Sequence, residues 1–224
     1  MTIWDRIYQN LIYQDRWQSI LDGLGVTLII SLLAIVFSTI FGLVLCLGKL
    51  SKWKIFRWSA MAYITIIRGT PMVLQLLIIY YGVFARATVP PVLIASIAFG
   101  LNSSAYVAEI MRGGILAVDA GQAEAARSLG LNKTQAMIRV VMPQAIKNFL
   151  PTYVSEFIVL IKETAIVGYI ALSDLTKVAD LIKGRTYDPW IPMIAAAILY
   201  LIVTGILTRL FSMLERRLRQ SDKR

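Results

Sequence analysis

Five long runs of apolar residues constrain the fold of this chain more than any other feature. The runs cover roughly 20–47, 56–84, 90–110, 145–172 and 191–211. About twenty apolar residues are enough for a helix to cross the hydrocarbon core of a bilayer. Charged residues make up only 16% of the chain, against roughly a quarter in soluble domains. The sequence therefore predicts an all-α membrane protein, with five transmembrane helices in a single domain over 1–224.

Lysine and arginine residues indicate how these helices are oriented, because short cytoplasmic loops are enriched in both. Two of them, Arg68 and Lys162, fall within the apolar runs. On one side of the membrane we place Lys49, Lys52, Lys54, Arg57, Arg112, Arg127, Lys133, Arg139, Lys147, Arg209, Arg216, Arg217, Arg219, Lys223 and Arg224, and on the other side only Arg6, Arg16, Arg86, Lys177, Lys183 and Arg185. We expect the richer side to be cytoplasmic, with the N-terminus outside and the C-terminus in the cytoplasm. The net charge of +10 then reflects topology, and nucleic acid is not an expected partner.

Two amphipathic segments accompany the runs. Apolar residues at helical spacing predict a helix over about 3–17 that lies along the membrane surface; they are Trp4, Ile7, Tyr8, Leu11 and Ile12. The link at 173–189 predicts a second short amphipathic helix on the outer face, followed by a turn at Gly184 and Asp188-Pro189.

Several kinds of chemistry are excluded by residue types that are rare or missing. The chain has no histidine, so histidine metal sites and imidazole acid–base catalysis are impossible. Cys46 is the single cysteine, which we expect to be a small apolar residue within a span. No Gly-x-x-x-x-Gly-Lys-[Ser/Thr] motif, which cradles nucleotide phosphates, occurs. We therefore expect neither a metal nor a nucleotide on this chain.

A polar interval at about 113–144 separates the third and fourth runs. Within it, the alanine-rich segment 121–129 predicts a helix, which Asp119 can cap and Gly130 can end in the left-handed conformation. The segment 132–135 (Asn-Lys-Thr-Gln) predicts a capping box for a second helix, which we expect to end near Pro143. The two short helices form a rigid elbow, which either docks a partner protein or is an ordinary packed loop.

The residues of this interval resemble a known signature. Glu124-Ala125-Ala126, three further residues, Gly130 and later Met142-Pro143 are similar to the EAA-loop signature of ABC importer permeases. Val140 and Met142 stand where that signature usually has isoleucine and leucine. The segments 68–71, 101–114 and 161–164 add to the resemblance, which points to the permeases of polar amino acid importers (histidine, glutamine and arginine systems). It covers nearly the whole chain from about residue 23.

The resemblance implies a translocation subunit rather than an enzyme, located in the bacterial cytoplasmic membrane. Its implied partners are two ABC ATPase subunits, which hold the ATP and Mg, a second permease copy or close relative, and an extracellular or periplasmic substrate-binding protein. The ATPase-coupling contact would be formed by Gln122, Glu124, Ala125, Ala126, Arg127 and Gly130. The substrate would be a polar amino acid, moved into the cell by alternating access. Which amino acid is carried, and whether the two permeases are identical, stays open.

Several polar residues fall within the apolar runs, where ionisable side chains are costly and are therefore functional candidates. Gly69 and Pro71 follow Arg68 directly, so we expect the second helix to unwind there and line a cavity. The candidate substrate-binding residues are Arg68, Thr70, Gln75, Asn102, Lys162 and Glu163. We expect Arg68, assisted by Thr70, to meet an α-carboxylate and Glu163 to meet an ammonium group. Gln75 and Asn102 would line the path.

The same charges fit a structural alternative, in which ion pairs lock helices together. Arg68 could pair with Glu163, or Lys162 with Glu163 or Glu109. Adjacent helical residues point about 100° apart, so Lys162 and Glu163 cannot both face one cavity squarely. Glu109 and Arg112 share a helix face, and we expect them to form a structural pair. The competing function is a secondary transporter or channel driven by an ion gradient, which an acidic residue at membrane depth would also serve.

Overall fold

The computed structural model describes residues 2–220, without the side chains of residues 214 and 216–220. All regular elements in this part are helices: α1 (Ile3–Ile7), η1 (Tyr8–Ile12), η2 (Tyr13–Asp15), α2 (Arg16–Leu50), α3 (Lys54–Arg68), α4 (Met72–Leu77), η3 (Ile78–Val83), α5 (Pro91–Leu116), α6 (Ala120–Ser128), α7 (Lys133–Ala136), η4 (Met137–Val141), α8 (Met142–Glu163), η5 (Thr164–Ile170), α9 (Leu175–Thr186) and α10 (Trp190–Gln220). The prediction of orientation also used Arg216, Arg217, Arg219, Lys223 and Arg224, which lie outside the described side chains.

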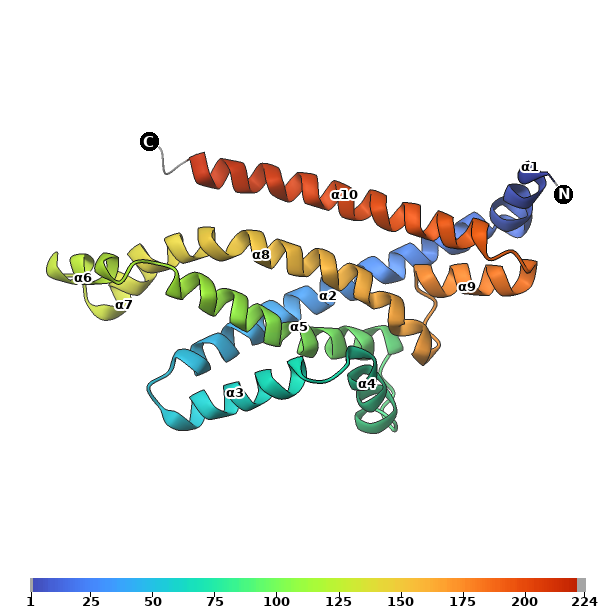
Figure 1. Ribbon diagram of the computed structural model, residues 1–224. Helices are drawn as coiled ribbons and strands as arrows, with labels where there is room; N and C mark the ends of the chain where they lie inside the picture. Colours follow the sequence, from blue (N-terminus) through green and yellow to red (C-terminus); the bar gives the residue numbers. More distant parts are fainter. Residues whose placement is uncertain (1, 221–224) are drawn as a thin grey trace.

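The long helices form a bundle with α2, α5 and α8 at its centre (Figure 1). α10 lies on one side of this centre, and α3 and α4 lie on the other. α1 and α9 are at one end of the bundle, whereas α6, α7 and the turn between α2 and α3 are at the opposite end. α1 therefore lies at the α9 end of the bundle, and α10 finishes at the α6 end.

The five predicted spans are found only in part. Three helices in the described residues are long and apolar enough to cross a membrane, namely Ile3–Leu50, Pro91–Leu116 and Trp190–Met213. Lys54–Arg68 and Met72–Val83 reach this standard only together, and they are bent by 106°. The second predicted span, 56–84, is thus a bent pair of helices, and the unwinding predicted at Gly69 and Pro71 is confirmed. α8 corresponds to the fourth run but is less apolar, because polar residues such as Lys147, Asn148 and Glu156 interrupt it.

Close packing of α2 against α5 depends on a glycine. A Cβ atom on Gly42 would lie 2.8 Å from Cγ1 of Val107 and 3.0 Å from the backbone oxygen of Ser104. Both neighbours are rigid, so only glycine lets the two helices approach this closely. Cys46 is fully buried nearby, as expected for a small apolar residue in a span.

The amphipathic helix predicted in the link at 173–189 is confirmed as α9. It buries Leu175, Val178, Ala179 and Ile182 in a cluster that also includes residues of α2 and α10. The turn predicted at Gly184 is wrong, because the helix continues to Thr186. The Tyr187 N–H still donates to the Lys183 oxygen at 2.9 Å, and Tyr187 itself takes the left-handed conformation (φ 55°).

A polar cluster fixes the N-terminal segment to the turn before α10. Arg6 donates to both carboxylate oxygens of Asp188, at 2.8 and 2.7 Å. Asn10 is buried, donates to Asp188 at 3.1 Å and accepts from the Thr186 hydroxyl at 2.7 Å. The predicted single surface helix over 3–17 is instead three short pieces, since Gln14 and Asp15 have positive φ and turn the chain into α2.

Candidate functional site

Two amide side chains hold the break between α3 and α4. Gln75 Nε2 donates to the Ile67 backbone oxygen at 2.8 Å and to Thr70 Oγ1 at 2.7 Å. Asn102 Nδ2, from α5, donates to Gln75 Oε1 at 3.0 Å. Both amides are buried. Gln75 satisfies the Ile67 oxygen, which the proline at position 71 leaves without its helical bond, and Asn102 holds Gln75 in place. The structure thus brings Thr70, Gln75 and Asn102 together, as support for the break.

Arg68 is the last residue of α3 and its side chain is exposed. Its guanidinium carbon lies 5.1 Å from the centre of the Tyr106 ring on α5, within the range of a cation–π contact. Among the described residues no ion pair engages Arg68. The ring therefore orients the guanidinium while its hydrogen-bond donors remain available to a ligand.

Glu156 of α8 joins this region, and sequence reasoning missed it. Ser103 Oγ, from α5, donates to Glu156 Oε1 at 3.0 Å. Ser103 and Tyr106 are three residues apart on α5 and lie on one face of it, so Glu156 and the Arg68 guanidinium, which contact them, share one region. Glu156 and Glu163 are about two helical turns apart and lie on one face of α8. That spacing, with the rarity of carboxylates at membrane depth, could have identified the residue.

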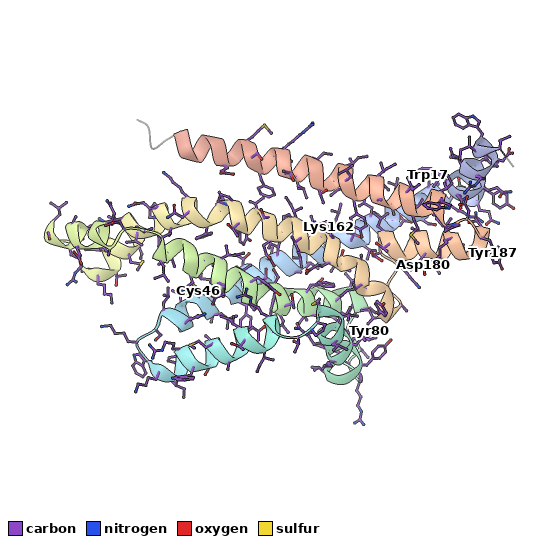
Figure 2. The ribbon with its side chains drawn as sticks, viewed as in Figure 1. Trp17, Cys46, Tyr80, Lys162, Asp180 and Tyr187 are labelled. Atoms are coloured by element: carbon purple, nitrogen blue, oxygen red, sulfur yellow. The ribbon has the colours of Figure 1, made fainter. Side chains whose placement is uncertain are left out.

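Lys162 and Glu163 form the exposed end of α8, with Lys162 marked in Figure 2. Neither Lys162 nor Glu163 makes an ion pair within 4.0 Å in the part of the chain that the structure describes. The alternative pairs of Arg68 with Glu163 and of Lys162 with Glu109 are not formed in this part. Substrate binding by these residues stays a prediction.

The expected pair of Glu109 with Arg112 is present, and it has a third member. Arg112 Nη2 donates to Glu109 Oε2 at 2.8 Å, and Lys49 of α2 forms an ion pair with the other carboxylate oxygen. This cluster joins α2 to α5 near the α6 end of the bundle. Lys49 could not be foreseen, because its partner depends on how the two helices are aligned.

The elbow between α5 and α8 has the predicted local structure. The Asp119 side chain accepts from the Gly121 N–H at 2.7 Å, and Gly130 ends the helix with a φ of +92°. The capping box is formed by Asn132 and Gln135. The end predicted near Pro143 is wrong. A π-helical turn leads from α7 into α8, and the proline lies in the first turn of α8.

The residues predicted for coupling present two different faces. Gln122, Glu124, Ala125, Arg127 and Gly130 are exposed, whereas Ala126 is buried against the protein. Leu129 is 87% exposed beside them, an apolar tip that sequence reasoning did not single out. Gln144 of α8 donates to Gln122 at 3.3 Å, so α6 is joined to the helix that carries Glu156 and Glu163.

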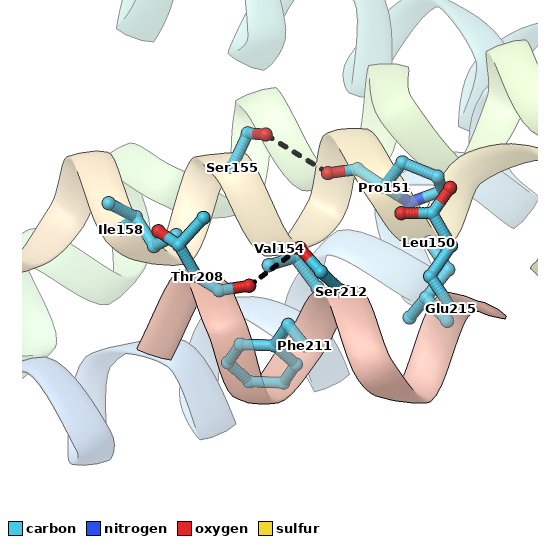
Figure 3. A pocket seen from close by; sticks show the side chains of 9 residues that line it. All are labelled: Leu150, Pro151, Val154, Ser155, Ile158, Thr208, Phe211, Ser212 and Glu215. Carbon is cyan, nitrogen blue, oxygen red and sulfur yellow. Dashed lines mark hydrogen bonds between the residues drawn. The ribbon is translucent and has the colours of Figure 1, made fainter. Parts of the chain in front are cut away.

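A groove between α8 and α10 is separate from these residues (Figure 3). It is lined by Leu150, Pro151, Val154, Ser155, Ile158, Thr208, Phe211, Ser212 and Glu215. The hydroxyls of Ser155 and Ser212 donate to backbone oxygens of their own helices, at 3.0 and 2.7 Å. No predicted substrate residue lines it. No cluster of three potential metal ligands occurs in the described residues.

Residues 35–220 match the profile of the family described as binding-protein-dependent transport system inner membrane component. The chain belongs to this family. The arginine transport system permease protein ArtQ of Bacillus subtilis (strain 168) is 41% identical to the permease over 205 residues, covering 91% of this chain and 94% of the relative. The putative glutamine transport system permease protein GlnP of Rickettsia bellii (strain RML369-C) is 39% identical over 203 residues, covering 89% and 92%.

A solved structure also indicates amino acid transport by an ABC system. A chain in a crystal structure of an amino acid ABC transporter with histidines superposes on the permease with a TM-score of 0.83 at 45% identity, covering 89% of this chain and 94% of that one. The protein is therefore the permease component of an amino acid ABC importer. This result does not support the alternative of transport driven by an ion gradient.

Proposed function

We propose that the permease carries amino acids with a cationic side chain, which bind beside the break between α3 and α4. The proposal rests on one observation: Arg68 and Glu156 contact the same turn of α5, through Tyr106 and Ser103, and Glu163 lies on the face of α8 that carries Glu156. A cationic α-amino acid has one carboxylate and two cationic groups, so its charges complement this set. One relative is named for arginine, which agrees with this choice, and others are named for glutamine, so the relatives alone do not decide the substrate.

Each candidate residue has a distinct role in this proposal. Arg68 binds the α-carboxylate, and Thr70 helps by turning its one O–H from the Ile66 oxygen, 2.9 Å away, to the ligand. Glu156 and Glu163 bind the α-ammonium and the side-chain cation. Gln75 and Asn102 hold the break in shape through their mutual hydrogen bond. Lys162 is adjacent to Glu163, but its side chain points about 100° away. The experiment below tests whether Lys162 binds substrate.

The test is binding of labelled arginine and glutamine to the purified importer and its variants. Glu156→Gln and Glu163→Gln should each weaken arginine binding about ten- to a hundredfold, the range for a lost bond to a charged group. At least one of these two variants should weaken glutamine binding less than arginine binding, because glutamine has no cation on its side chain. Arg68→Gln should weaken both ligands, because the α-carboxylate is common to them. Lys162→Gln decides whether that residue binds substrate.

A control variant and a clear contrary result complete this test. Asp180→Asn removes a carboxylate on the surface of α9, far along the chain from the break, and should leave both affinities unchanged. Equal losses for arginine and glutamine in both glutamate variants, or no loss in either, would remove the assignment of a cationic substrate. The assignment to the ABC permease family would stand in either case.

We further propose that α6 contacts an ABC ATPase subunit, of which the complete importer has two, and that these subunits hold the ATP and Mg. Its exposed face, formed by Gln122, Glu124, Ala125, Arg127 and Gly130, supports this choice, and Ala126 anchors the helix from the buried side. The bond between Gln122 and Gln144 offers a route from α6 into α8. A second permease copy or close relative would enclose the path, and an extracellular or periplasmic binding protein would deliver the substrate.

The proposed topology has five crossings, with the bent pair counted as the second and α8 as the fourth. It places the N-terminus outside and α6 in the cytoplasm of a bacterial cell. Single cysteines test this, because the native Cys46 is buried. A membrane-impermeant maleimide should label Tyr187→Cys on intact cells, and Ser128→Cys only after the membrane is opened. The reverse pattern would overturn the orientation.

A further inference from the structure

The turn between α2 and α3 combines exposed cations with exposed aromatic rings. Lys52, Lys54 and Arg57 are all exposed. Trp53 and Trp58 are 70% and 64% exposed, and the Phe56 ring lies 6.2 Å from the Trp53 ring. We name these six residues, Lys52, Trp53, Lys54, Phe56, Arg57 and Trp58, the basic–aromatic turn. Neither feature is used by the proposed substrate site or by α6.

The cations of the basic–aromatic turn have no acidic partner within the described residues. No ion pair within 4.0 Å engages Lys52, Lys54 or Arg57 there. The sequence explains why, since residues 23–108 contain neither Asp nor Glu. Lys49, the neighbouring cation, is turned inward to Glu109. The turn is therefore a local concentration of positive charge that requires an anion from outside the chain.

The position of the turn selects the kind of anion. It follows the end of α2, an apolar helix long enough to span a bilayer, and lies at the same end of the bundle as α6 (Figure 1). Tryptophan is enriched where membrane helices reach the headgroup level. α3 turns Ala60 and Ile64 toward α2, while the rings of Trp53, Phe56 and Trp58 remain uncovered. The proposed topology puts those rings at the depth of lipid headgroups.

We propose that the basic–aromatic turn binds the headgroups of anionic phospholipids in the cytoplasmic leaflet. The two lysines and the arginine would pair with lipid phosphates, and the rings would anchor the turn among the headgroups. α3 runs from this turn to Arg68, roughly 22 Å at 1.5 Å per residue, so the bound lipids also fix one end of the helix that leads to the break. The inference rests on the proposed orientation only for the choice of leaflet.

The test is photolabelling of the importer, purified with its ATPase, in nanodiscs. Photoreactive phosphatidylglycerol and a matched phosphatidylcholine probe are compared, and labelled segments are identified after digestion with pepsin. The segment 51–58 should react several-fold more with phosphatidylglycerol. The triple variant Lys52→Gln, Lys54→Gln and Arg57→Gln should lose this preference and react equally with the two probes, because the cations that attract an anionic lipid surface are gone.

Two matched variants separate charge from structure. Lys52→Arg, Lys54→Arg and Arg57→Lys together keep the charge and should keep the preference. Arg86→Gln removes a cation from the loop before α5 and should not alter labelling of 51–58. Equal labelling by both probes, or a preference that survives the triple glutamine variant, would overturn the proposal. So would labelling that occurs only when the ATPase is absent, because a protein would then cover the turn.

This experiment is independent of the proposed substrate site. Lipid labelling needs no amino acid, and Glu156→Gln should label as the native permease does. Nanodiscs expose both leaflets and contain the anionic lipid in each, so the preference would be seen whichever side of the membrane is cytoplasmic. A failure of the substrate assignment would therefore leave the lipid result intact, and the converse also holds.

Discussion

Asn102 on α5 donates a 3.0 Å hydrogen bond to Gln75 on α4, and both side chains are buried. Through this bond α5 holds the residue that closes the break after α3. The break is therefore an ordered part of the fold, because a hydrogen bond from a neighbouring helix holds it in place. Its exposed flank carries Arg68, which Tyr106 of the same α5 helix orients.

Replacing Asn102 by alanine should destabilise the permease by about 1–3 kcal/mol, the cost of leaving a buried amide oxygen without its donor. The measurement is thermal unfolding in detergent. Ser59→Ala is the control, because the exposed Ser59 hydroxyl donates only to its own helix, and it should change stability by less than about 0.5 kcal/mol. If Asn102→Ala were as stable as this control, the bond to Gln75 would not be what supports the break.

The parts of the site that the sequence predicted are those set by local backbone chemistry. Gly69 and Pro71 interrupt a helix wherever they occur together, and Gly130 ends α6 because it alone accepts a φ of +92° without strain. Pro143 shows the limit of such reasoning. A proline ends a helix from within but is tolerated in its first turn, and only the structure shows where that turn begins.

The parts that the sequence did not predict depend on how helices are aligned in space. Glu156 is paired with Ser103, and Glu109 with Lys49, across separate helices. One sequence gives the face of a helix on which a residue lies, but not the residue opposite. The same reason explains the buried position of Ala126, which one short helix cannot specify.

Gly42→Ala should destabilise the permease by about 1–3 kcal/mol, the usual effect of overpacking a rigid contact. The new methyl group would lie 2.8 Å from Val107 Cγ1, and α2 would have to move away from α5. Gly25→Ala on the same helix is the matched control, since nothing lies within 4 Å of its Cβ position. It should be neutral or stabilising, because alanine favours the helix. Equal unfolding temperatures for the two variants would contradict the close approach.

The contact of Arg6 with Asp188 predicts a pH dependence at the N-terminal segment. The Arg6 guanidinium lowers the pKa of the Asp188 carboxyl to about 2, from an ordinary value of about 3.9. Because the folded-state pKa is depressed, the contact stabilises fully above about pH 4. This contribution is lost as the pH falls toward about 2.

Hydrogen exchange of the amides in 2–12 measures this effect. Their protection, corrected for the intrinsic rate, should be constant above about pH 4 and should fall between about pH 4 and 2. In Asp188→Asn the protection should be lower at neutral pH and should lack this step. A step of the same size in the variant would assign the titration to another group.

Gly130→Ala should separate substrate binding from ATP-driven uptake. Alanine in the left-handed conformation costs about 1–2 kcal/mol, and relief of that strain would change the angle between α6 and α7. If α6 is the ATPase contact, uptake into vesicles should fall several-fold while arginine binding to the permease is unchanged. Gly113→Ala is the control, since Gly113 has open space around its Cβ position and no positive φ. Uptake by Gly130→Ala that equals uptake by Gly113→Ala would mean that the bend at the end of α6 does not transmit force from the ATPase.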